Sequence, residues 1–144
     1  MDEAVESPKS EIRVDGIATG KIVSGAYLEA AVRWNDFYLL FMTDDCPFEE
    51  SLNIHLLDKN ADLVDSATMF SMYSTGSFSS LKLMEPNTLH YNFFGDIVWR
   101  LELLTTPVFS WPFLGNPRGV WRKFKFKCHF KIYGRPLPEI YKRE

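Results

Sequence analysis

The segment from Lys123 to Tyr133 alternates apolar and basic residues without a break, and this pattern constrains the fold more than any other. Side chains of a β-strand point to opposite faces with a period of two, so the segment is predicted to be a half-buried strand. One face carries Phe124, Phe126, Cys128, Phe130 and Ile132, and the other carries Lys123, Lys125, Lys127, His129 and Lys131. The chain is therefore expected to be rich in β structure, with a basic stripe on one strand.

The rest of the chain reads as short extended segments separated by turn residues about every 10 positions, which is typical of antiparallel hairpins. Phe37–Thr43 is apolar on both faces and is expected to be a central strand covered on both sides. Residues 26–34 are ambiguous, because their alanines also suit two helical turns. We predict an all-β, mainly antiparallel fold of about eight or nine strands with at most one short helix, either a β-sandwich or an up-and-down barrel.

The length of 144 residues and the hydrophobic content of 46% predict a single domain with a core of its own. This domain is expected over residues 11–134, between a flexible N-terminal tail at 1–10 and a C-terminal tail at 135–144. The first residues are acidic and polar, unlike a secretory signal, and no apolar run approaches the roughly 20 residues of a membrane span. Neither cysteine has a spacing that suggests a disulfide framework. We therefore expect a cytoplasmic protein without a membrane span.

Charge is distributed unevenly along the chain. Residues 1–117 hold 7 Lys/Arg and 17 Asp/Glu, a balance of −10, whereas residues 118–144 hold 9 Lys/Arg and 2 Asp/Glu, a balance of +7. Such asymmetry is typical of a chain that binds an anionic partner. The alternative is that the acidic body and the basic end pair with each other inside one fold.

No motif in the chain indicates a catalytic centre. The glycines of Gly16–Gly20 lie one residue too close for a phosphate-binding loop, and the serines near Gly76 have no neighbouring base. His55, His90 and His129 lack the spacing of a metal site and are expected at the surface or rim of strands. We predict no catalytic residue, no cofactor and no metal, although an enzyme with a dispersed active site stays an open alternative.

Residues 105–120 form the one long irregular stretch, with three prolines and two glycines. Irregular loops longer than about 12–15 residues are usually functional or mobile. This one is unusually apolar, since it contains Val108, Phe109, Trp111, Phe113 and Leu114. It is expected to cap an open end of the fold, to form a contact surface, or to line a ligand pocket.

These features favour a non-catalytic interaction module that binds an acidic protein partner or assembles with itself. The expected partner-binding residues are those of the basic strand face and the aromatic loop: Lys123, Lys125, Lys127, His129, Lys131, Phe109, Trp111, Phe113, Arg118 and Arg122. The alternative is a β-barrel that binds a small apolar ligand. Nucleic acid is disfavoured as a partner, because the isoelectric point of about 5.6 is acidic.

Overall fold

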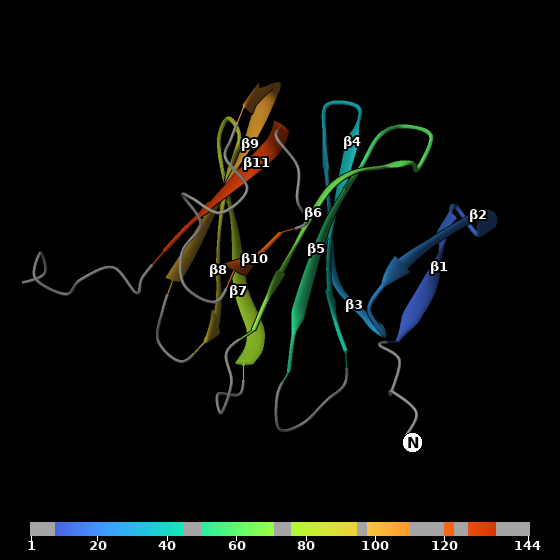
Figure 1. Ribbon diagram of the computed structural model, residues 1–144, viewed down its shortest axis with the longest axis horizontal. Helices are drawn as coiled ribbons and strands as arrows, with labels where there is room; N and C mark the ends of the chain where they lie inside the picture. Colours follow the sequence, from blue (N-terminus) through green and yellow to red (C-terminus); the bar gives the residue numbers. More distant parts are fainter. Residues whose placement is uncertain are drawn as a thin grey trace, which may run out of the picture.

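A computed structural model of the chain describes residues 8–44, 50–70, 76–94, 98–109, 120–122 and 127–134. All regular elements in these residues are strands, and every pairing between neighbouring strands is antiparallel (Figure 1). The strands are β1 (Lys9–Val14), β2 (Ile17–Ser24), β3 (Tyr27–Trp34), β4 (Phe37–Thr43), β5 (Leu52–Leu57), β6 (Leu63–Met69), β7 (Gly76–Met84), β8 (Thr88–Phe94), β9 (Val98–Phe109), β10 (Val120–Trp121) and β11 (Lys127–Tyr133). The predicted all-β class is confirmed.

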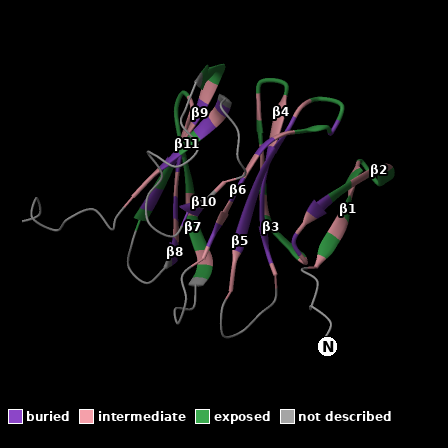
Figure 2. Cartoon of the chain, viewed as in Figure 1, coloured by how far each residue is buried: buried purple, intermediate pink, exposed green. Residues whose placement is uncertain are grey.

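The strands form a five-stranded sheet, a four-stranded sheet and a separate hairpin. The five-stranded sheet has the order β10-β6-β5-β4-β3, the four-stranded sheet has the order β11-β9-β8-β7, and β1 pairs only with β2. The two larger sheets pack face to face, with the buried residues between them (Figure 2). Of the two predicted architectures, the described strands therefore form the β-sandwich and do not close into a barrel.

The core follows from the alternation of apolar residues along the strands. In the five-stranded sheet, Leu39 and Phe41 of β4 point into the sandwich, and Tyr91 of β8 meets them from the four-stranded sheet. The ring centroids of Phe41 and Tyr91 are 5.2 Å apart and tilted by 60°, which is a favourable aromatic geometry. Trp99 is fully buried in the same cluster. This packing fixes which face of each strand is left for solvent or for another layer.

Strand β4 is covered on both sides, as its sequence predicts. Its second face carries Leu40 and Met42, which pack against Val23 of β2 and Leu57 of β5 in a second apolar cluster. The hairpin β1–β2 (blue in Figure 1) thus lies on the outer face of the five-stranded sheet and adds a third layer. This layer explains why an apolar strand does not expose its outer side chains to water.

The alternation predicted for the basic strand is confirmed at positions 128 and 130–132, whereas His129, expected on the exposed face, is partly buried with Nδ1 4.0 Å from Oδ2 of Asp65. Cys128, Phe130 and Ile132 of β11 are buried, whereas Lys131 is exposed. Residues 123–126 lie outside the described residues. The inward assignment of this strand rests on the fully buried ring of Phe130, which joins the sandwich core.

Two segments differ from the prediction. Residues 105–109, expected in an irregular loop, continue β9 as far as Phe109, where β9 pairs with Lys127 of β11. The pairing then moves from Cys128–Val108 directly to Phe130–Leu103, so residues 104–107 of β9 lie opposite His129 alone. This irregularity is larger than a one-residue bulge, and the sequence pattern does not reveal it. Residues 9–10, expected in the N-terminal tail, already belong to β1. The ambiguous residues 26–34 form strand β3.

Candidate functional site

The outer face of the four-stranded sheet gathers polar and charged side chains from all of its strands. The register places Tyr133 opposite Arg100, Arg100 opposite His90, and His90 opposite Lys82. Directly opposed residues of antiparallel strands share a face, so these four side chains form one row across the sheet. A neighbouring row contains Lys131, Glu102 and Thr88. We call the set of Lys82, His90, Arg100, Glu102, Lys131 and Tyr133 the basic face.

Contacts within the basic face hold Arg100 and Tyr133 together. The guanidinium carbon of Arg100 lies 4.3 Å from the centroid of the Tyr133 ring, which is a cation–π geometry. The Tyr133 hydroxyl donates a hydrogen bond of 3.3 Å to Oε1 of Glu102. Burial, followed by the charge of Glu102, raises the pKa of Tyr133, so the phenol remains a donor at neutral pH. Glu102 therefore accepts a hydrogen bond from a neutral phenol, and the Arg100 guanidinium lies over the Tyr133 ring.

The remaining charge of the basic face is positive. Lys82, Arg100 and Lys131 are exposed, and Glu102 is the one acidic member of the set. Neither Lys82 nor Lys131 forms an ion pair with any residue that the structure describes. The three cations lie on β7, β9 and β11, with His90 of β8 between Lys82 and Arg100. The guanidinium of Arg100 carries a planar array of donors, a group that binds carboxylates in a bidentate manner.

The predicted site residues fall into three groups. Lys131 is exposed on the basic face, and the backbone of Lys127 pairs with that of Phe109 at the end of β9. Arg122 and His129 are partly buried and turn toward Asp65. The other predicted residues, Lys123, Lys125, Trp111, Phe113 and Arg118, lie outside the described residues.

Asp65 brings Arg122 and His129 together inside the sandwich. Its Oδ2 atom accepts a 2.6 Å hydrogen bond from Nη2 of Arg122 and a 2.7 Å bond from the backbone N–H of His129. Nδ1 of His129 lies 4.0 Å from the same oxygen, and Oδ1 accepts the backbone N–H of Ser66 at 2.8 Å. The Arg122 guanidinium also stacks over the Phe130 ring, 4.4 Å from its centroid. Part of the basic end therefore pairs with the acidic body inside the fold, as the alternative interpretation of the charge asymmetry expected.

Of the basic face, sequence reasoning found Lys131 and missed the other five members, which include Lys82, His90 and Arg100. These three lie in different strands, and nothing local in the sequence distinguishes them from ordinary surface residues. Only the register of β7, β8 and β9 places them in one row. Polar residues at alternate positions of neighbouring hairpin strands are the signal that could have found them, once the turns fix the register.

One histidine prediction is wrong. His55 was expected at the surface or rim, but its exposed fraction is 5%. Its Nε2 atom lies 2.8 Å from the backbone carbonyl oxygen of Ser24, at the end of β2. The hairpin covers this part of β5, so the residue becomes buried although it points away from the sandwich core. His90, by contrast, is partly exposed on the basic face, in agreement with the prediction.

The residues that the structure describes contain neither a metal-binding arrangement nor a membrane-spanning helix. No group of three or more His, Cys, Asp or Glu side chains there is arranged to hold a metal ion. The described residues also include no helix that is long and apolar enough to cross a membrane. The chain matches no protein-family model, no curated protein and no solved structure.

Proposed function

We propose that this protein is a non-catalytic interaction module that binds an acidic protein partner through the basic face. The row of Tyr133, Arg100, His90 and Lys82 carries the proposal, because it extends the positive charge of β11 across the whole four-stranded sheet. An open sheet face with cations on three of its four strands is suited to a partner surface, whereas it offers no enclosed site for a reaction. Electrostatic complementarity of this kind determines which partner binds and how fast it associates.

The charge distribution favours an acidic protein over a nucleic acid. The whole chain carries a net charge of −3, so it lacks the overall positive charge that is typical of nucleic-acid-binding domains. Glu102 lies within the face and would oppose a continuous phosphate backbone, while separated carboxylates of a folded partner can avoid it. A second copy of this chain is also an acidic protein, since residues 1–117 carry a balance of −10. Self-assembly is therefore a special case of the same proposal.

We further propose that the protein acts in the cytoplasm. Cys128 is a free thiol and is buried in the strand that carries Lys131. Unpaired thiols are common in proteins of reducing compartments. The expected partner is then an acidic protein of the same compartment.

A binding assay with a labelled acidic peptide tests the proposal. Fluorescein-labelled poly-L-glutamate is titrated with the full chain, and fluorescence anisotropy is followed at ionic strengths from about 0.05 M to about 0.3 M. We expect binding that weakens as salt is added, because the contacts are between exposed charges. A variant that combines Lys82→Ser, Arg100→Ser and Lys131→Ser should lose most of this binding.

The control removes the same charge elsewhere. The control variant carries Lys9→Ser, Arg33→Ser and Lys59→Ser, which remove three exposed cations outside the basic face. It should bind the peptide about as well as the wild type, apart from the effect of the changed net charge. Equal loss in both triple variants would show that only net charge matters and would reject the basic face. Tighter binding of a labelled single-stranded oligonucleotide than of poly-L-glutamate would reject the choice of an acidic protein.

A further inference from the structure

A cavity of about 420 Å³ lies beneath the hairpin β1–β2, on the outer face of the five-stranded sheet. This volume is within the range of about 300–1,000 Å³ that small-molecule sites have. Its walls are mainly apolar and include Ile12 and Val14 of β1, Val23 of β2, Leu28 of β3, and Leu40 and Met42 of β4. It lies on the five-stranded sheet, whereas the basic face belongs to the other sheet, so the two features are independent.

The hairpin is attached to the sheet at its base. Gly25 lies so close to Met42 that a Cβ atom on Gly25 would be 2.6 Å from the Cβ of Met42. Ser10 Oγ donates a 2.6 Å hydrogen bond to the carbonyl oxygen of Gly25, and the backbone N–H of Gly25 donates to Pro8 at 2.9 Å. These contacts place the roof of the cavity at a defined distance from its floor.

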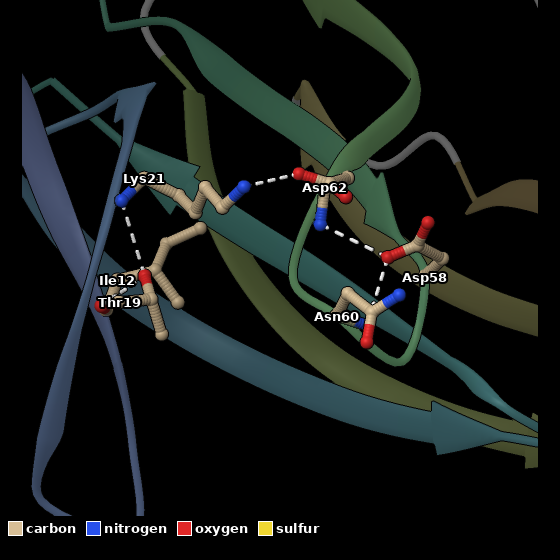
Figure 3. Close-up of polar contacts among 6 residues, drawn as sticks. All are labelled: Ile12, Thr19, Lys21, Asp58, Asn60 and Asp62. Carbon is tan, nitrogen blue, oxygen red and sulfur yellow. Dashed lines mark hydrogen bonds and ion pairs between the residues drawn. The ribbon is translucent and has the colours of Figure 1, made fainter.

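A second attachment lies farther along the hairpin. Lys21 of β2 forms an ion pair with Asp62 in the turn between β5 and β6 (Figure 3). That turn is itself ordered, because Oδ1 of Asp58 accepts the backbone N–H groups of Asn60 at 2.9 Å and Asp62 at 3.0 Å. With both attachments in place the cavity exists before any ligand binds, and preorganisation of this kind lowers the cost of binding.

Several polar groups in and near the cavity form hydrogen bonds within the hairpin. Oε2 of Glu11 accepts the backbone N–H of Gly20 at 3.0 Å, and the Thr19 hydroxyl donates to the carbonyl oxygen of Ile12 at 2.7 Å. Tyr38 also lines the cavity. Its hydroxyl has no hydrogen-bond partner among the residues that the structure describes. Glu11, Arg13 and Asp15 of the hairpin also line the cavity. Its mainly apolar interior is therefore bordered by charged side chains and by Tyr38, whose hydroxyl is available to a ligand.

We infer that this cavity binds a small apolar molecule with a single hydrogen-bonding group, which Tyr38 meets. A second depression of about 310 Å³ on the other side of the hairpin has a more polar lining, with Lys9, Ser24, His55 and Ser66, and is less suited to an apolar molecule. A peptide segment is a poorer occupant of the larger cavity, because an extended chain would have to displace the hairpin from its two attachments.

The neutral fluorescent probe N-phenyl-1-naphthylamine tests this inference, since its emission rises in an apolar site and its N–H group can donate to Tyr38. We expect saturable binding with one probe per chain. Ala31 lies at an exposed position of β3 that lines the cavity, so Ala31→Phe should weaken binding at least tenfold by filling it. Tyr38→Phe should weaken binding about two- to tenfold, the value of one neutral hydrogen bond.

The matched control is Ala18→Phe, which places the same side chain at an exposed position of β2 outside the cavity lining. It should bind the probe like the wild type, and so should the triple variant of the basic face. Absence of saturable binding, or equal weakening by Ala18→Phe and Ala31→Phe, would overturn the inference. If the wild-type chain does not bind poly-L-glutamate at all, the proposed function is rejected and this inference is unaffected.

An NMR experiment on the unmodified chain keeps the inference testable if Ala31→Phe fails to fold. With methionine methyl groups labelled, the probe should shift the signal of Met42, whose side chain lines the cavity, and leave that of Met69 in the sandwich core unchanged. Assignment follows from Met42→Leu and Met69→Leu. A shift of Met69 without a shift of Met42 would place the probe elsewhere and overturn the inference.

Discussion

Asp65 and Arg122 form an ion pair with a separation of 2.6 Å between Oδ2 and Nη2, and their side chains are only 2% and 10% exposed. Asp65 lies in β6 of the five-stranded sheet, and the same oxygen accepts the backbone N–H of His129 in β11 of the four-stranded sheet. One carboxylate therefore connects the two sheets near the edge where β10 and β11 lie. Buried charges of this kind must be paired, because an unpaired charge in the interior is costly.

Asp65→Ala is expected to destabilise the fold strongly. The substitution leaves the Arg122 guanidinium nearly buried without its partner, and removal of one member of a buried pair costs about 3–5 kcal/mol. Urea unfolding followed by tryptophan fluorescence measures the free energy of unfolding. The control is Asp62→Ala, which breaks the exposed Lys21–Asp62 pair and should cost about 0–1 kcal/mol. Similar losses for both variants would show that the Asp65 pair does not hold the sheets together.

Arg122 and Lys131 should respond differently to removal of their charge, although the sequence assigns both to the same binding surface. Arg122→Gln leaves the Asp65 carboxylate without its cation and should cost about 3 kcal/mol or more. Lys131→Ser changes an exposed side chain and should cost less than about 0.5 kcal/mol, while it weakens binding of poly-L-glutamate. The measurements are urea unfolding and fluorescence anisotropy. A stable Arg122→Gln variant with weakened peptide binding would return Arg122 to the binding surface.

The sequence alone predicts those parts of the fold that depend on local alternation. The period of two places Phe130 and Ile132 in the core, and the two apolar faces of β4 indicate that this strand has a cover on each side. These predictions succeed because burial of apolar surface decides the face of a strand, whatever its neighbours are.

Features that depend on the pairing of distant strands could not be predicted in this way. The row from Tyr133 to Lys82 requires the register of four strands, and β7 and β9 both contain irregularities that shift it. Likewise, His55 is polar and sits on the outer side of β5, so its sequence position suggests exposure. His55 is buried because the hairpin β1–β2 covers it, and nothing near His55 in the sequence indicates this additional layer.

Gly25→Ala is expected to disturb the attachment of the hairpin. The added Cβ would lie 2.6 Å from Cβ of Met42, at a residue whose φ of +131° already disfavours a side chain. The control is Gly20→Ala, which also has a positive φ, of +80°, but has nothing within 4 Å of the added atom. Both variants strain the backbone, and the strain is greater at +131° than at +80°, so the difference between them reports this extra strain together with the contact with Met42. We expect Gly25→Ala to cost about 1–3 kcal/mol more in urea unfolding, as overpacking does.

The same pair of variants also connects the hairpin with the cavity. If the contact between Gly25 and Met42 positions the roof, Gly25→Ala should weaken binding of N-phenyl-1-naphthylamine, whereas Gly20→Ala should not. Equal stability and equal probe binding in the two variants would show that the hairpin adjusts to the added methyl group without loss.

Tyr91 should make the fold sensitive to alkaline pH. Burial raises the pKa of its phenol, because the phenolate would lose its hydration in the core, where the hydroxyl donates to Sδ of Met69 at 3.1 Å. The folded chain thus keeps a proton that the unfolded chain loses above about pH 10, so the free energy of unfolding is unaffected below that pH and falls above it. The expected slope from this residue is about 1.4 kcal/mol per pH unit. Urea unfolding between about pH 9 and about pH 11 measures how the free energy of unfolding depends on pH, and Tyr91→Phe should remove this component of the slope. The control is Tyr133→Phe, at a partly exposed position, which should remove much less. An unchanged slope in Tyr91→Phe would show that another group governs alkaline unfolding.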